Sequence, residues 1–252
     1  MEHSKHRATF GGGVTAVRGA LTLRCPSVVA AYDEASRVKT VTCSGPVTAT
    51  DRGRTMTAGT GEFDNLAGVL TLHGEPTLVD GARRLVGEEL TYVVGSEQVE
   101  LTHAKAQLPA RDAAGAPRIA GQGPLAISAD RVLYELEARS ALFTGGVTAR
   151  RGDLSLHCAR LTTSHDEAGN VERAVTSGGT VTVVQRDRRA RAGKAEFLGT
   201  AGRLVLSDEP VLTEGESTLA GDRVTFLLGD DRVEVERPRA TFPLDAARGA
   251  GK

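Results

Sequence analysis

The sequence predicts an all-β protein made of two tandem copies of one antiparallel module. Three observations lead to this prediction: apolar and polar residues alternate with a period of two, turn residues interrupt the alternation repeatedly, and the second half of the chain repeats the first. A period of two places one face of an extended strand against a core and the other face in solvent. The expected fold is therefore built from sheets alone.

The repeat is visible in a direct alignment. Residues 10–25 read FGGGVTAVRGALTLRC and residues 143–158 read FTGGVTARRGDLSLHC, identical at eleven of sixteen positions with an offset of 133 (143 − 10). Chance would give about one identity at ordinary residue frequencies. A one-residue insertion near Gly179 raises the offset to 134, and the match ends near Glu100 and Glu234. The repeated unit is a whole module, for which about eight strands are expected.

The strands are expected in the same order in both copies. In the first copy the alternation is clear in residues 21–25 and 41–49, and 65–68 form a turn between later strands. In the second copy 154–158 alternate in the same way, and 167–170 form a turn. Such short strands fit an antiparallel jelly roll, an open barrel or a solenoid of stacked rungs. No strong period of about 20 to 30 residues appears within a copy, which disfavours the solenoid.

The repeat also predicts the domain boundaries. We expect a first module at 1–106, a linker rich in Ala, Gly and Pro at 107–124, a second module at 125–243 and a tail at 244–252. Residues 125–134 read as a strand that leads into the second module, and in the first copy the corresponding stretch would precede Met1. We therefore expect either an incomplete N-terminus or a first module that borrows a strand from a partner.

The sheet edges at the two ends are expected to differ. The missing lead-in strand leaves a docking place for a partner strand at the start of the first module. At the other end a final strand is expected within 231–242, where Val233 and Val235 alternate with charged residues. Pro238 and Pro243 would blunt its further pairing, because proline has no backbone N–H.

Composition excludes several classes of function. Thirty-one Lys and Arg face thirty-two Asp and Glu, so the formal net charge of −1 provides no global field for nucleic acid. Aromatic residues make up 4% of the chain and Trp is absent, which disfavours stacking platforms for sugars or bases and a polysaccharide-active enzyme. No run of about eighteen apolar residues occurs, so no membrane-spanning segment or signal peptide is expected in the chain as written.

Catalytic and metal-binding motifs are also missing from the sequence. The three cysteines, Cys25, Cys43 and Cys158, have no Cys-x-x-Cys spacing and are expected to be small buried residues, although a Cys25–Cys43 disulfide stays open. The histidines are scattered, with no His-Glu-x-x-His or Gly-x-Ser-x-Gly motif. We predict no catalytic residue, metal or cofactor. The basic run 185–194 suits either phosphate contacts at a groove rim or a solvated hairpin turn, and the turn is preferred.

Both copies carry a similar series of short motifs. In the second copy these are Ile127-Ser-Ala-Asp130, Phe143-Thr-Gly-Gly-Val147, Gly152-Asp-Leu-Ser-Leu156-His-Cys-Ala159, Ser177-Gly-Gly-Thr-Val181, Ala195-Glu-Phe197, Leu204-Val-Leu206 and Leu219 to Phe226. In the first copy they are Gly12-Gly-Val14, Gly19 to Leu23, Gly45-Pro-Val47, Glu62-Phe63, Leu70 to Gly74 and Leu85 to Tyr92. In order and spacing, each copy resembles the OstA/LptA-like domain of the lipopolysaccharide-transport bridge.

This resemblance implies tandem open antiparallel β-jelly rolls, each folded like a V, with an apolar interior that holds lipid acyl chains. It implies a non-enzymatic, periplasmic carrier that binds lipopolysaccharide and passes it towards the outer membrane. The implied partners are lipopolysaccharide and other bridge components joined by end-to-end strand pairing, with head-to-tail self-association as a further expectation. Members of the family usually carry one module and a signal peptide, whereas this chain has two modules.

The alternation identifies the side chains expected to line such an interior. The predicted groove residues are Val14, Leu21, Leu23, Val41, Val47, Leu70, Leu72, Val147, Leu154, Leu156, Val181, Leu204, Leu206, Leu219 and Phe226. The same residues would form the core of a closed β-sandwich, because most apolar strand faces only pack against each other. The alternative function is therefore a structural β-scaffold or interaction module with a closed core and no lipid ligand.

Overall fold

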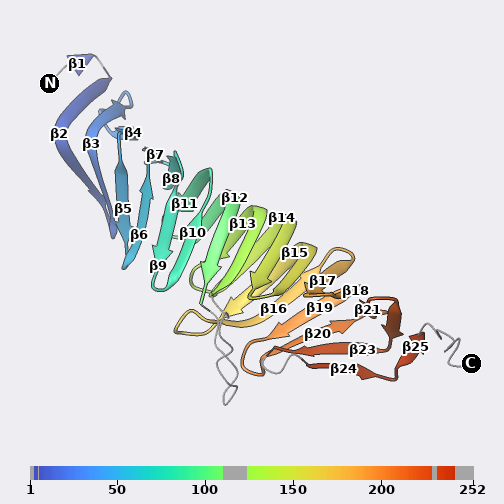
Figure 1. The fold of residues 1–252 in the computed structure, drawn as a ribbon. Coiled ribbons are helices and arrows are strands. Elements are labelled where there is room, and N and C mark those ends of the chain that lie inside the picture. The colour runs from blue at the N-terminus through green and yellow to red at the C-terminus, as the bar shows by residue number, and fades with distance from the viewer. Residues whose placement is uncertain (1–2, 5, 110–123, 229–231, 242–252) are drawn as a thin grey trace, which may run out of the picture.

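The structure is a computed structural model that describes residues 3–4, 6–109, 124–228 and 232–241. These residues form strands and turns, without helices, and every strand pair is antiparallel, which confirms the predicted all-β class. The strands stack side by side along a long, twisted molecule with β1 at one end and β25 at the other (Figure 1).

Each module contains more strands than the alternation suggests. The first comprises β1 (His3–Ser4), β2 (Arg7–Arg18), β3 (Leu21–Tyr32), β4 (Val38–Ser44), β5 (Val47–Asp51), β6 (Arg54–Ala58), β7 (Thr60–Asp64), β8 (Val69–His73), β9 (Thr77–Asp80), β10 (Arg83–Val86), β11 (Glu89–Val93) and β12 (Gln98–Leu108). The second comprises β13 (Leu125–Glu135), β14 (Ser140–Arg151), β15 (Leu154–His165), β16 (Val171–Ser177), β17 (Val181–Gln185), β18 (Arg188–Ala192), β19 (Lys194–Leu198), β20 (Arg203–Ser207), β21 (Val211–Glu214), β22 (Ser217–Ala220), β23 (Arg223–Leu227), β24 (Arg232–Glu236) and β25 (Arg239–Thr241). The expectation of about eight strands was too low, because the chain crosses between two sheets and each crossing divides an extended segment.

Long strands that bend join these two sheets into a V. The first half of β3 pairs with β5, and its second half pairs with β4. From this division sheet I continues through β5, β6, β9 and β10, and sheet II continues through β4, β7, β8 and β11. Both sheets meet again at β12. Beyond β15 the same division sends β17, β18, β21, β22 and β25 into sheet I, and β16, β19, β20, β23 and β24 into sheet II.

The bend of the long strands requires glycine at one position in particular. The ladder between β14 and β15 shifts register between Thr144 and Val147, and Gly145 there has a φ of 79°. A Cβ on Gly145 would overlap the Asp130 side chain, so a larger residue would be both strained and obstructed. The paired glycines in the Phe-x-Gly-Gly-Val motifs therefore mark the corner where each V is folded.

The duplication predicted from sequence is present strand by strand. From β2 to β11, each strand of the first module has a counterpart in β14 to β23 at an offset of 133 or 134. The counterpart of β12 is divided into β24 and β25 by Arg237 and Pro238. His103 and Arg237 occupy the same place in the repeat and both have positive φ, 46° and 48°. The final strand expected at 231–242 is therefore two short strands, and its end residues lie outside the described part.

The two modules are joined through a shared sheet. Strands β12 and β13 pair from Gln98↔Glu135 to Leu108↔Leu125, so both sheets run from one module into the next. The expected linker, 107–124, begins within β12, and its residues 110–123 lie outside the described part, as does the expected tail at 244–252. The lead-in strand expected at 125–134 is β13.

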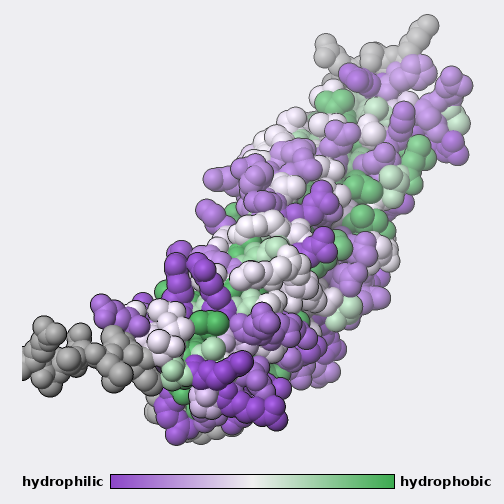
Figure 2. All heavy atoms as spheres, turned by 90° about the vertical axis from the view of Figure 1, so that its right-hand side faces the viewer, coloured by the Kyte–Doolittle hydropathy of each residue, from purple (hydrophilic) through white to green (hydrophobic). Residues whose placement is uncertain are grey.

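The core lies between sheets I and II along the whole molecule. Inward side chains of both modules form one continuous apolar cluster, from Leu21 in β3 to Phe226 in β23. Figure 2 shows hydrophobic residues in a broken line along the length of the molecule, with hydrophilic surface on either side. The alternation in sequence thus becomes a long interior with an apolar rim.

Candidate functional site

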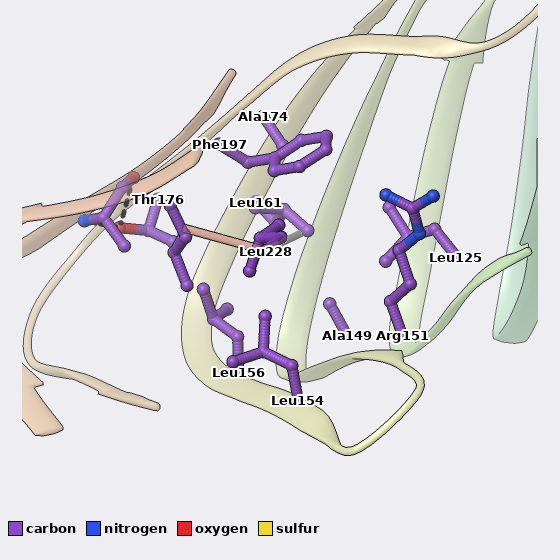
Figure 3. Close-up of a pocket in the computed structure, with 12 residues that line it drawn as sticks. Leu125, Ala149, Arg151, Leu154, Leu156, Leu161, Ala174, Thr176, Phe197 and Leu228 are labelled. Atoms are coloured by element: carbon purple, nitrogen blue, oxygen red, sulfur yellow. Dashed lines mark hydrogen bonds between the residues drawn. The ribbon is translucent and has the colours of Figure 1, made fainter. Parts of the chain in front are cut away.

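An apolar pocket lies between the two sheets of the second module (Figure 3). Its space measures about 550 Å³, including the part that opens to solvent. The lining residues are Leu125, Ala149, Arg151, Leu154, Leu156, Leu161, Ala174, Thr176, Ala195, Phe197, Leu204 and Leu228. Ten of the twelve are apolar, so the pocket suits a hydrocarbon guest better than a polar one.

The walls of the pocket come from both arms of the V. Leu154 and Leu156 belong to the half of β15 that pairs with β17 in sheet I. Leu161 lies in the other half of β15, and Phe197 and Leu204 lie on β19 and β20 of sheet II. The pocket therefore lies inside the V, where strand alternation directs the apolar side chains of both sheets.

Thr176 adds little polarity to the pocket. Its hydroxyl donates to the carbonyl of Ala195 at 3.3 Å and accepts a hydrogen bond from the amide of Ala195 at 2.8 Å. A hydroxyl with both bonds made to the neighbouring strand costs little to bury. The first module has Cys43 at this position of the repeat.

Arg151 is the charged residue of the pocket. It is only 9% exposed, and Figure 3 shows its guanidinium beside Leu125, to one side of the other lining residues. The first module repeats this residue as Arg18, which is exposed and lies over the ring of Phe63 at 5.2 Å. Arg151 was absent from the sequence prediction, although it continues the inward series Val147, Ala149 at the correct period of two.

Polar side chains connect the two sheets inside the first module. The Tyr92 hydroxyl on sheet II donates to Asp51 on sheet I. Nearby, Glu97 forms ion pairs with Arg52 and with Arg54, the latter at 3.1 Å. Burial, followed by the hydrogen bond to Asp51, raises the pKa of Tyr92 to about 12. Asp51 and Glu97 are each 4% exposed, so this polar bridge lies within the core.

A second polar connection lies where the modules meet. Arg83 at the start of β10 donates to the Tyr134 hydroxyl, lies 5.4 Å from the centre of its ring and pairs with Asp80 at 3.0 Å. The ring of His165 also meets Tyr134 edge-on, with the ring centres 6.0 Å apart. Burial and the Arg83 charge lower the pKa of His165 to about 4. The junction is thus tied across the V by charged and aromatic groups.

The residues predicted to line a groove all lie in or against the core. Leu154, Leu156 and Leu204 line the pocket. The others are buried in the apolar cluster or pack against it: Val14, Leu21, Leu23, Val41, Val47, Leu70, Leu72, Val147, Val181, Leu206, Leu219 and Phe226. Alternation identified the inward faces, but it could not separate packed positions from those that border free space.

The three cysteines are buried, and the basic run is part of the strand framework. All three cysteines are free and buried, and burial with the neighbouring Cys25 raises the pKa of the Cys43 thiol to about 12. Burial raises the pKa of Cys158 to about 11. The basic run 185–194 spans the turn between β17 and β18, strand β18 itself and the first residue of β19, and Arg186 in the turn pairs with Asp153 at 2.7 Å.

Within 3–4, 6–109, 124–228 and 232–241, no three His, Cys, Asp or Glu side chains gather as a metal site would require. No helix long and apolar enough to cross a membrane occurs in these ranges.

Together, the antiparallel V and its apolar interior define a tandem open β-jelly-roll protein. The family model described as "LptA/(LptD N-terminal domain) LPS transport protein" matches residues 1–98 and 126–231, where LPS is lipopolysaccharide. The chain therefore belongs to this family of lipopolysaccharide transport proteins, as the sequence motifs indicated. The gap between the matched segments contains the end of β12 and the expected linker.

Similarity to individual proteins is low. No curated protein matches the chain. Among solved structures the chain is similar to LptH from Pseudomonas aeruginosa, described as the LptA-homologous periplasmic component of the conserved lipopolysaccharide transport device. The two are 18% identical with a TM-score of 0.43, over 47% of this chain and 94% of LptH.

Proposed function

We propose that this protein is a non-enzymatic, periplasmic carrier that holds the acyl chains of lipopolysaccharide between sheets I and II and passes the lipid towards the outer membrane. The observation that carries the proposal is the apolar pocket inside the V of the second module. Membership of the lipopolysaccharide transport family supports the choice of ligand. The pocket walls belong to different sheets, so a guest chain would be covered from both sides.

Burial of hydrocarbon supplies enough free energy for such binding. At about 0.8 kcal/mol per methylene, a twelve-carbon chain gains about 10 kcal/mol on leaving water. Ordering of the lipid and of the pocket side chains reduces this gain. The remainder is suited to a carrier, which must hold its cargo and also release it.

Filling the pocket tests this proposal. Ala174→Leu places a larger side chain inside the pocket, and we expect it to lower the affinity for lipopolysaccharide at least tenfold, or about 1.4 kcal/mol. Val175→Leu on the outward face of the same strand is the matched control and should bind as the wild type does. Binding is measured by displacement of a fluorescent fatty acid, with circular dichroism to verify folding. Equal binding by both variants would remove the pocket from the proposal, and no binding by the folded wild type would favour a closed scaffold.

The sheet edges supply the second part of the proposal, which is end-to-end pairing with other bridge components. In the second module β13 covers the outer edge of β14 along its length. In the described part of the first module, the matching edge of β2 pairs only with β1, at His3↔Ala8 and Ser4↔Arg7. An unpaired edge of this length is a template for strand addition.

The junction between the two modules, at β12 and β13, indicates the direction in which an added strand would run. Because β13 is antiparallel to both β12 and β14, these two strands run parallel to each other. In a head-to-tail stack with the same geometry, one antiparallel strand would therefore stand between the β24–β25 edge of one copy and β2 of the next. A peptide with the sequence of residues 125–135 is a suitable probe for the β2 edge.

We expect this peptide to bind the protein, and a scrambled peptide of equal composition not to bind. The readout is fluorescence anisotropy of the labelled peptide. Replacement of Thr15 in β2 by proline removes a backbone donor from the strand and should weaken binding of the peptide. Thr225→Pro, in the interior strand β23, is the control that shows how far a proline in any strand weakens binding through loss of folded structure. Equal binding of both peptides would contradict the proposed pairing.

A further inference from the structure

Arg151 occupies an unusual place for a charged residue. It ends β14 on the inward face, lines a pocket whose other walls are almost entirely apolar, and is 9% exposed. Figure 3 shows its guanidinium beside Leu125, to one side of the leucines and Phe197 that line the rest of the pocket. A buried guanidinium keeps its charge, so its cost must be met by anionic or hydrogen-bonding partners.

The repeat offers a direct comparison for this residue. Arg18 is its counterpart in the first module, and Phe63 there is the counterpart of Phe197. Arg18 is exposed and lies over the Phe63 ring at 5.2 Å. In the second module the guanidinium of Arg151 and the ring of Phe197 lie apart, and both border the pocket (Figure 3). The same pair of residues thus closes together in one module and borders free space in the other.

We propose that Arg151 binds the anionic group of an acylated ligand whose hydrocarbon chain occupies the pocket. This inference rests on the proposed lipid carriage and specifies the ligand class: an amphiphile with a phosphate or carboxylate next to its acyl chain. The planar guanidinium can donate two parallel hydrogen bonds to either anion. A ligand anion would add to the interactions that Arg151 already makes.

The low polarity of the pocket explains why one arginine is sufficient to bind the anionic group of the ligand. Charge-assisted hydrogen bonds are stronger where apolar side chains exclude water. Leu125 lies beside the guanidinium, while Leu154, Leu156 and Phe197 form apolar wall further along the pocket. An amphiphile could therefore place its charge at Arg151 and its chain along the leucines.

The test compares ligands that share one chain. Dodecyl phosphate, dodecyl maltoside and inorganic phosphate are titrated into the full chain by calorimetry, below the concentrations at which the amphiphiles form micelles. We expect dodecyl phosphate to bind at least tenfold more tightly than dodecyl maltoside, and inorganic phosphate to bind far more weakly than either. Arg151→Met, which keeps the length of the side chain, should lose the preference for phosphate and retain the maltoside affinity.

Two further variants complete the test. Arg151→Lys keeps the charge without the planar fork and should retain only part of the preference, while Arg18→Met, at the exposed counterpart, should bind as the wild type does. If Arg151→Met fails to fold, the ligand preference of the wild type and of Arg151→Lys decides the question.

Three results would overturn the inference. They are equal wild-type affinity for the two amphiphiles, a phosphate preference that survives in folded Arg151→Met, and inorganic phosphate binding as tightly as dodecyl phosphate. The first two leave lipid carriage intact, and after the third, saturable binding of dodecyl maltoside would show whether the pocket still takes an acyl chain. Failure of every amphiphile to bind would instead reject the proposed function itself.

Discussion

The two modules share one strand plan but have different interiors. In the first module, Tyr92 and Asp51 connect the sheets through a buried hydrogen bond, and Glu97 adds ion pairs beside it. At the corresponding positions of the second module, Phe226 replaces Tyr92 and Gln185 replaces Asp51. The second module has the apolar pocket between its sheets.

The difference teaches which residues determine the fold and which determine the space inside it. Strand ladders repeat at an offset of 133 or 134 even where inward side chains change, because backbone hydrogen bonds do not depend on side-chain identity. A few inward substitutions then decide whether the two arms of the V are tied together or separated by a pocket. Duplication therefore supplies two copies of one fold, and the interior of one can change while the other remains tied.

The largest effect is expected from core leucines at matched positions. Leu70 and Leu204 are counterparts and are 1% and 2% exposed, but only Leu204 borders the pocket. Leu70→Ala should lower the free energy of unfolding by about 4 kcal/mol, and Leu204→Ala by about 3 kcal/mol, because a side chain beside free space loses fewer contacts. Urea unfolding of the two variants measures the difference. Equal costs would mean that the two interiors are packed alike.

The polar bridge is tested by Glu97→Gln. The substitution keeps the shape of the side chain but leaves Arg54, which is 15% exposed, without its anionic partner. We expect the free energy of unfolding to fall by about 3 kcal/mol, at the lower end of the cost of breaking a buried pair, because Arg52 reaches solvent.

The matched control is Glu62→Gln on β7, where the side chain is exposed. It should change the free energy of unfolding by less than about 0.5 kcal/mol. A similar loss in both variants would show that the buried bridge contributes nothing beyond ordinary surface charge.

His165 tests the junction between the modules through pH. Its folded pKa of about 4 lies below the ordinary value of 6.5, so the folded state favours the neutral ring. The stabilisation is complete above pH 6.5 and is lost as the pH falls towards 4, because the unfolded chain binds the proton first. We expect a loss of about 2 to 3 kcal/mol over this range from the histidine.

The comparison of His165→Gln with the wild type isolates this contribution from other titrating groups. The variant should lose less stability between pH 6.5 and pH 4, as measured by urea unfolding at each pH. His157→Gln, at an exposed position in the same strand, should retain the wild-type pH dependence. Parallel curves for wild type and His165→Gln would contradict burial of a neutral ring at the junction.

Sequence predicted the periodic parts of this molecule and missed the parts that depend on distant contacts. Alternation and duplication were sufficient for the all-β class and for the inward faces that carry Leu154, Leu156 and Leu204. They could not predict the hydrogen bond from Tyr92 to Asp51, because these residues are 41 positions apart and lie on different sheets.

Arg151 was missed for a different reason. Charged residues are usually exposed, so an arginine at the end of an apolar series reads as the beginning of a turn. The period of two nevertheless continues through it, and the buried class of Arg151 follows from that period. An inward charge in a strand should therefore be retained as a candidate site residue.

The smallest predicted effect concerns the exposed arginine of the first module. Arg18→Met removes the guanidinium from the face of Phe63 while keeping a long apolar side chain. The free energy of unfolding should fall by about 0.5 to 1 kcal/mol, the usual contribution of an exposed cation–π contact. Thermal and urea unfolding measure this change, with Arg24→Met, another exposed arginine of the same module, as the control. A loss well above this range would mean that Arg18 helps to close the first module, and the contrast between the two interiors would then depend on this arginine as well as on the buried bridge.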